Sequence, residues 1–189
     1  MEVIRDIEIS SARSTACLND FNCGIPAMDK FIHDGLQQSI DHHYCRLYVA
    51  KANNMIVAMF ALSFDSIDLD SDDKEEIALG ISSTGTPSLA FDYEDTFYSK
   101  KRYPALDIAY FAVRKEYRNR HIGQRLISAI KDMARKQEVG GCQFLSVEAY
   151  NIPEYTAVPF YDKCGFAPNE LSNPNKDTLR MFYTLYAKE

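Results

Sequence analysis

The residues between 111 and 124 have the types and order needed to bind a phosphate group. Residues 105–113 are nearly all apolar and predict a buried strand, and residues 122–137 repeat apolar side chains at helical spacing. The first turn of a helix presents unpaired N–H groups and a partial positive charge, which together bind pyrophosphate. The candidate residues for the pyrophosphate are those of the turn, Arg118, Asn119, Arg120, His121, Ile122, Gly123 and Gln124, and the rest of the ligand would lie against Phe111 and Val113 of the strand.

The backbone and the local charge of this turn support the same prediction. Close approach of a backbone to a ligand favours glycine or positive φ, and Gly123 is present. Asn119 and His121 are residue types enriched in the left-handed region. Residues 114–136 hold eight Lys or Arg and two acids, in a chain of net charge −6. A solvated helix face would explain the bases alone, but the strand–turn–helix context favours phosphate binding.

Two segments resemble signatures of the GNAT superfamily of acyl-CoA N-acyltransferases. Residues 118–123 are similar to its central motif, Arg/Gln-x-x-Gly-x-Gly/Ala, with His121 where the family usually has glycine. Asn151 followed by A-x-x-F-Y-x-x-x-G-F, which begins at Ala157, is similar to the second signature. The resemblance is strong over residues 105–166 and looser elsewhere.

The resemblance implies an enzyme that moves an acetyl group from acetyl-CoA to an amine by direct attack, without a metal. Asn151 would bond the pantetheine arm, and Tyr161 would protonate the departing thiolate. Backbone N–H groups near Val113 would stabilise the oxyanion. Glu148 is the candidate general base, and Tyr110 is an alternative. Because of His121, a non-catalytic CoA-binding module is the alternative function.

The acceptor is expected to be a small-molecule or peptide amine. The runs Phe21-Asn22-Cys23-Gly24 and Tyr103-Pro104-Ala105 resemble a GNAT branch of bacterial toxins that acetylate aminoacyl-tRNA and pair with an antitoxin. Transfer RNA is a second hypothesis that the acidic net charge disfavours, because phosphate contacts require clustered bases. A homodimer and an antitoxin partner are left open.

The wider pattern predicts an α/β fold with a central mixed sheet flanked by helices. One domain over residues 1–189 is expected, with an acidic, loop-rich segment at 64–104 between the two halves. The expected order is β-α-β-β, the acidic insertion, then β-α-β-α-β. The expected strands are 3–9, 46–51, 55–63, 105–113, 142–149 and 179–186, and the expected helices are 25–40, 122–137 and 153–163.

Composition excludes several other kinds of protein. The five cysteines form no CxxC pair, and His42, His43 and Cys45 lack a partner motif for zinc, so no metal site is expected. Residues 68–79 lack the glycine and the final acid of a calcium loop. The longest apolar run, 55–62, is too short to span a bilayer, and no signal peptide is evident. We therefore expect a cytoplasmic protein without a membrane partner.

Overall fold

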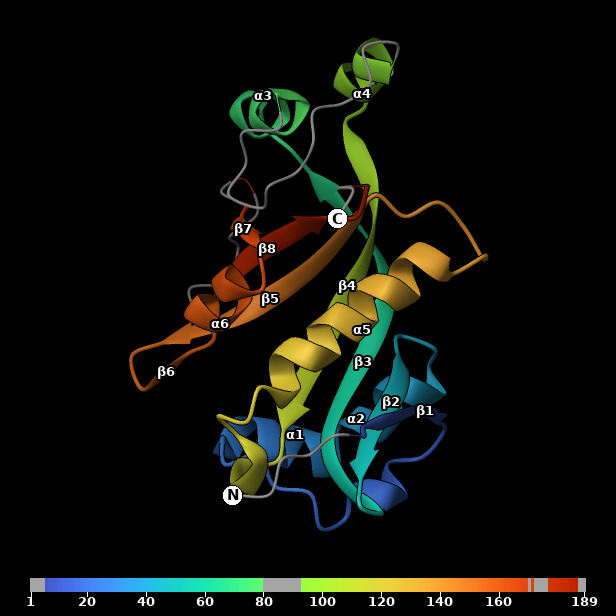
Figure 1. Ribbon diagram of the computed structural model, residues 1–189, viewed down its shortest axis with the longest axis vertical. Helices are drawn as coiled ribbons and strands as arrows, with labels where there is room; N and C mark the ends of the chain where they lie inside the picture. Colours follow the sequence, from blue (N-terminus) through green and yellow to red (C-terminus); the bar gives the residue numbers. More distant parts are fainter. Residues whose placement is uncertain (1–5, 80–92, 170, 172–176, 187–189) are drawn as a thin grey trace. The chain divides into compact units, whose positions relative to one another are not determined.

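The computed structural model describes residues 6–79, 93–169, 171 and 177–186 (Figure 1). The strands are β1 (Glu8–Ala12), β2 (Arg46–Ala52), β3 (Met55–Asp68), β4 (Arg102–Val113), β5 (Phe144–Ile152), β6 (Tyr155–Thr156), β7 (Ala167–Pro168) and β8 (Thr178–Thr184). The helices are α1 (Pro26–Asp34), α2 (Leu36–Asp41), α3 (Ser71–Leu79), α4 (Glu94–Ser99), α5 (Ile122–Lys136) and α6 (Val158–Lys163), with short 3-10 turns η1 (Thr15–Leu18) and η3 (Lys115–Tyr117).

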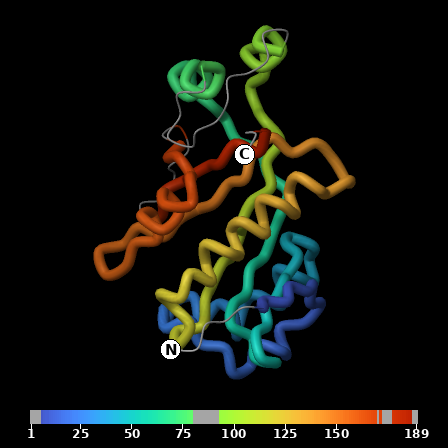
Figure 2. The backbone as a smooth tube through the Cα atoms, viewed as in Figure 1, coloured from blue at the N-terminus to red at the C-terminus, as the bar shows by residue number. Residues whose placement is uncertain are grey.

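Within the described residues the strands form one mixed sheet in the order β1-β2-β3-β4-β5-β8-β7, and β6 pairs with β5. This confirms the expected α/β fold with a mixed sheet. The chain divides into two compact units, residues 1–63 with 108–128 and residues 64–107 with 129–189. The chain trace in Figure 2 shows β3, β4 and α5 as continuous elements, and each contributes residues to both units. The expectation of one domain over residues 1–189 stays a prediction.

The first unit contains the predicted hairpin. β2 and β3 pair antiparallel around Asn53 and Asn54, whose φ angles of 49° and 63° suit the tight turn of a two-residue hairpin. β1 pairs with β2, so the strand expected at 3–9 instead runs from Glu8 to Ala12. Residues 3–5 of that expected strand lie outside the described residues.

The predicted helix at 25–40 is two helices, because the chain turns at Gly35. Helix α1 begins with Pro26 in its first turn, as expected, and ends where the Gly35 N–H donates to the Phe31 carbonyl. A Cβ on Gly35 would lie 2.9 Å from the Phe31 ring, so glycine lets that ring fold against the backbone. The apolar spacing predicts the helical segment correctly, but it does not reveal a break at a single residue.

The second unit is built around β5. β5 pairs in parallel with β4 from Ala105↔Phe144 to Asp107↔Ser146, and antiparallel with β8 along seven residue pairs. The helix expected at 153–163 is wrong in its first half, because β6 folds back on β5 before α6 begins at Val158. The expected strand boundaries at 142 and 179 differ from those observed by one or two residues.

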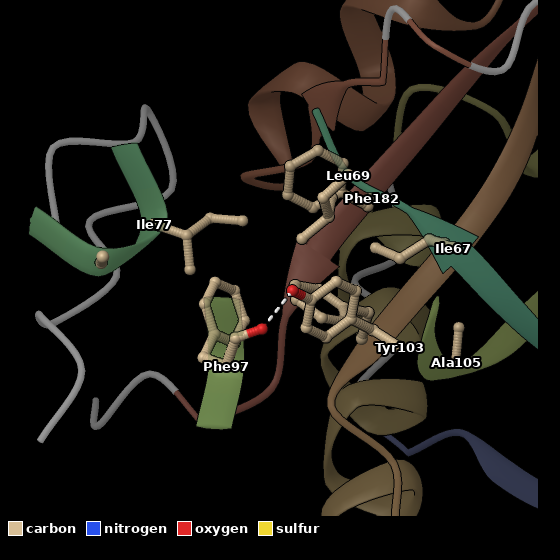
Figure 3. Packing of buried hydrophobic residues seen from close by; sticks show 9 residues of the cluster. Ile67, Leu69, Ile77, Phe97, Tyr103, Ala105 and Phe182 are labelled. Carbon is tan, nitrogen blue, oxygen red and sulfur yellow. Dashed lines mark hydrogen bonds between the residues drawn. The ribbon is translucent and has the colours of Figure 1, made fainter. Parts of the chain in front are cut away.

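The acidic segment contains more regular structure than the expected loop. β3 continues to Asp68, and α3 and α4 follow it; residues 80–92 lie outside the described part of the chain. Ile77 and Phe97 from these helices are buried in an apolar cluster with Phe144 and Phe182 (Figure 3). In this cluster the Tyr103 hydroxyl donates to the Phe97 carbonyl at 2.6 Å. Charged residues dominate the composition of the acidic segment, but a few buried apolar side chains determine its structure.

Candidate active site

The β4–α5 turn lies in the first unit and has the predicted backbone. Asn119 and His121 have φ angles of 59° and 58°, which confirms that they occupy the left-handed region. Helix α5 begins immediately afterwards at Ile122. One ring nitrogen of His121, Nδ1, lies 2.8 Å from Oε1 of Gln124 in the first turn of that helix. His121 therefore adopts a conformation that glycine would adopt without strain, and a local contact helps to hold it.

The start of α5 is fixed by apolar packing. Ile122 and Leu126 are buried in a cluster with Ala50 and Ala58 of the β2–β3 hairpin. The candidate residues Phe111 and Val113 of β4 pack against the same cluster and are partly buried. The strand end and the helix start are thus held to one apolar surface, which places the backbone of the turn between them.

Arg114 connects the turn to two other segments of the first unit. Its backbone N–H donates to the Val57 carbonyl at 2.8 Å. Its guanidinium donates to the carbonyls of Ile56 at 2.8 Å and Asp20 at 2.9 Å, and lies 5.4 Å from the centre of the Phe21 ring. Its side chain is 11% exposed, so these contacts are largely shielded from water. A shielded guanidinium with several acceptors restrains the turn strongly.

The remaining side chains of the turn face water to different degrees. Arg118 and Gly123 are half-buried, whereas Asn119, Arg120 and Gln124 are exposed. The Arg120 guanidinium lies 5.1 Å from the centre of the Tyr117 ring. The turn thus combines a helix start, two left-handed residues and nearby guanidinium groups, an arrangement that fits a pyrophosphate.

The second unit contains a polar stripe that runs across four adjacent strands, β3, β4, β5 and β8. Its residues are Asp65, Asp107, Ser146, Glu148, Thr178 and Arg180. Arg180 Nη1 lies 3.5 Å from Asp107 Oδ1 and 3.3 Å from Glu148 Oε1, and Arg180 Nη2 pairs with Asp65. These side chains are far apart in the sequence, so the pairing of the strands brings them together.

Asp107 is an ionisable residue of this stripe that the sequence did not predict as a site residue, as are Asp65 and Arg180. Its side chain is buried, and it accepts a hydrogen bond of 2.9 Å from Ser146 Oγ. Burial raises the pKa of Asp107 to about 6, although Arg180 and the Ser146 hydroxyl lower it. A carboxyl with a pKa near 6 can accept a proton at neutral pH. The signal was an aspartate within the apolar run ALDIAYFAV at 105–113, where a charged residue requires a reason.

The predicted base, Glu148, lies in the same stripe but in a different environment. It is exposed, and its carboxylate accepts from Thr178 Oγ1 at 2.7 Å and from Arg180. Tyr110, the alternative, packs against Phe31 with ring centres 4.4 Å apart and ring planes tilted by 32°. Asp107 combines deeper burial with a raised pKa, so it suits the task of a base better than Glu148 does.

Tyr161 lies on α6 and is buried, with its ring against those of Phe160 and Phe166. Burial raises the pKa of Tyr161, and the nearby Tyr155, Asp107 and Cys164 raise it further. The phenol therefore stays protonated at neutral pH, which is the form required of a proton donor. Gly165, with a φ of 83°, ends the helix, and the Phe166 N–H returns to the Tyr161 carbonyl.

Asn151 is part of the β5–β6 hairpin. Its Oδ1 accepts from Thr156 Oγ1 at 3.2 Å, and its backbone N–H donates to the Asp177 carbonyl at 2.8 Å. The side chain is exposed, and its predicted contact with a pantetheine arm stays a prediction.

Among the described residues, no group of three or more His, Cys, Asp or Glu side chains is arranged to hold a metal ion. The cysteines are free thiols, and burial raises the pKa values of Cys23, Cys45, Cys142 and Cys164. None of the helices in the described residues has the length and apolar character needed to cross a membrane.

Comparison with solved structures supports the fold over nearly the whole chain. AtaT complexed with acetyl-methionyl-tRNAfMet has a TM-score of 0.66 at 18% identity, covering 95% of both chains. A tyrosine-to-phenylalanine mutant of KacT has a TM-score of 0.67 at 16% identity, covering 96% of both chains. A mutant AtaT toxin bound to the C-terminus of the antitoxin AtaR and acetyl-CoA has a TM-score of 0.61 at 15% identity, covering 96% of this chain and 94% of that one.

At the level of sequence, no curated protein matches the chain. A family model, described as the acetyltransferase (GNAT) domain, does match residues 43–168. That range includes the β4–α5 turn, Asp107 and Tyr161, and it covers well over half of the chain. The chain therefore belongs to the GNAT family of acetyltransferases, which are acyl-CoA-dependent N-acyltransferases.

Proposed function

We propose that the protein transfers the acetyl group of acetyl-CoA directly to an amine, with Asp107 as the general base and Tyr161 as the general acid. The observation that carries this proposal is the buried Asp107 carboxyl, held by Ser146 and Arg180, whose pKa is raised by burial to about 6. The β4–α5 turn would hold the pyrophosphate of the cofactor through residues 118–124. Asn151 would bond the pantetheine arm.

The proposed reaction balances its protons with these two groups. Asp107 takes a proton from the acceptor ammonium, and the neutral nitrogen attacks the thioester carbonyl to form a tetrahedral oxyanion. The carbon–sulfur bond then breaks, and the thiolate takes the phenolic proton of Tyr161. The second proton of the attacking nitrogen returns to the phenolate, and Asp107 releases its proton to water. Each proton transfer is worth roughly a hundred- to ten-thousand-fold in rate.

The test is acetyl-CoA turnover with a panel of amines, together with calorimetry of acetyl-CoA binding. Asp107→Asn and Tyr161→Phe should each lower kcat by roughly a hundred- to ten-thousand-fold while the Kd for acetyl-CoA is unchanged. Glu148→Gln is the matched comparison on the same polar stripe. A larger loss in Glu148→Gln than in Asp107→Asn would assign the base to Glu148. Binding of acetyl-CoA with no turnover on any amine would favour a non-catalytic CoA-binding module.

The amino group of an aminoacyl-tRNA is the second candidate acceptor. The observation that favours it is the similarity in fold to AtaT complexed with acetyl-methionyl-tRNAfMet. An antitoxin partner is supported in the same way by the AtaT complex with the C-terminus of AtaR. The amine panel should therefore include charged tRNA beside peptides and polyamines, and acetylation of the tRNA alone would identify the acceptor. A cytoplasmic location and a homodimer belong to this proposal as well.

A further inference from the structure

Arg180 is shared by carboxylates from three different strands of the second unit. Its guanidinium contacts Asp65 on β3, Asp107 on β4 and Glu148 on β5, and its own side chain is 12% exposed. The backbone of Arg180 is held on both sides: it pairs with Glu148 on β5, and its carbonyl accepts from the Asn169 N–H at 2.8 Å. The guanidinium is thus placed by paired strands and not by a mobile loop.

The groups that interact with Asp107 come from β3, β5, β8 and α6. Asp65 on β3, Ser146 and Glu148 on β5, Arg180 on β8 and Tyr161 on α6 all interact with it. Arg180 is the cation among these groups, and it carries one positive charge against three carboxylates. A planar guanidinium can donate to several carboxylates at once, which the ammonium of lysine does less well. Loss of Arg180 would leave Asp107 buried beside two acids.

We propose that Arg180 is a positioning residue that keeps Asp107 ionised and its carboxylate fixed, so that Asp107 can accept a proton from the acceptor amine. This inference rests on the proposed function, because it assigns Arg180 to the base of that reaction. Its physical basis is a balance of opposite charges: Arg180 lowers the pKa of Asp107, whereas Asp65 and Glu148 raise it. Neighbours of opposite sign should therefore shift the titration of Asp107 in opposite directions.

The first measurement is the acidic limb of the pH profile of kcat/KM, which reports the pKa of the base in the free enzyme. Arg180→Gln should move this limb to higher pH by roughly one to three units, the effect of a guanidinium beside an aspartate. Asp65→Asn should move it to lower pH. The matched control is Arg102→Gln, which removes the same charge from the same unit at a 74% exposed side chain paired with Asp68. That control should leave the limb in place.

The second measurement does not require turnover. The carboxyl carbon of Asp107 is titrated by NMR in each variant and assigned by its loss in Asp107→Asn. If the wild-type protein acetylates no amine, the proposed function fails, while this titration still decides whether Arg180 controls Asp107. If Arg180→Gln does not fold, Arg180→Lys replaces it; lysine keeps the charge, so a smaller shift to higher pH is expected.

Two results would overturn the inference. One is an unchanged Asp107 titration in a folded Arg180→Gln or Arg180→Lys variant. The other is a shift in the same direction for Arg180→Gln and Asp65→Asn, because general loosening of the structure, and not charge, would then be the cause. Opposite shifts, with Arg102→Gln unchanged, support it.

Discussion

At the scale of single residues, the Asp107 carboxyl is a group whose charged form is disfavoured by its surroundings. It lies in the interior of the second unit, and its partners Ser146 and Arg180 offset only part of the cost of removing an ionised carboxylate from water. The raised pKa therefore also affects stability, because ionisation of Asp107 costs more free energy in the folded state than in the unfolded state.

The raised pKa predicts that the effect of Asp107→Asn on the free energy of unfolding depends on pH. The pKa of Asp107 is about 6 in the folded protein and about 3.9 in an unfolded chain, so the folded state binds more protons between these values. The contribution of Asp107 to the free energy of unfolding therefore falls as pH rises from 4 to 6. The difference in free energy of unfolding between Asp107→Asn and wild type, measured by urea denaturation, should favour the variant by about 2–3 kcal/mol more at pH 8 than at pH 4. An equal effect of the substitution at both pH values would contradict a raised pKa.

At the scale of secondary-structure elements, the β4–α5 turn is fixed at both ends and strained in the middle. Arg114 anchors its start to Ile56 and Asp20, and Ile122 buries the start of the helix. Between these points the chain passes through two left-handed residues. Such a conformation costs a residue other than glycine about 1–2 kcal/mol, and the surrounding contacts must hold it.

Substitutions at His121 should therefore separate strain from side-chain contact. His121→Gly should change the free energy of unfolding little, because relief of strain is offset by chain entropy and by loss of the contact with Gln124. His121→Val should be less stable than His121→Gly by about 1–2 kcal/mol and should raise the KM for acetyl-CoA. Ser128→Val, at an exposed position of the following helix α5, is the control for β-branching and should leave that KM unchanged. Equal stability of the glycine and valine variants would show that the left-handed conformation is not required.

At the scale of the whole molecule, the net charge of −6 and the basic region at 114–136 have opposite implications for an acidic partner. The acids are concentrated elsewhere, for example along α3 and at the start of α4. Repulsion of RNA by the net charge is screened within about 8–10 Å at ordinary ionic strength, whereas a local group of bases acts at contact distance. The acidic composition alone therefore does not exclude tRNA.

If charged tRNA is bound through this region, its affinity should fall steeply with salt. The logarithm of the binding constant should decrease linearly with the logarithm of salt concentration, and Arg120→Gln should reduce that slope by roughly one. Lys101→Gln removes an exposed positive charge outside residues 114–136 and should leave the slope unchanged. Fluorescence anisotropy across a salt series measures both slopes. A flat dependence on salt would exclude binding through phosphates at this site.

The sequence by itself determined the features that depend on neighbouring residues. The Asn53–Asn54 hairpin, the strand–turn–helix at 105–136 and the left-handed Asn119 and His121 follow from local backbone preferences and apolar spacing. The resemblance in the turn and around Tyr161 also predicted the family correctly.

Only the tertiary structure decided which distant residues meet. Asp65, Asp107, Glu148 and Arg180 are separated by tens of residues, and strand pairing aligns them in one stripe. The same holds for Phe97 of the acidic segment, whose burial depends on partners such as Phe144 that composition does not reveal. Desolvation and charge interactions depend on three-dimensional distance, so the pKa of Asp107 follows from how the strands pack and not from its position in the sequence.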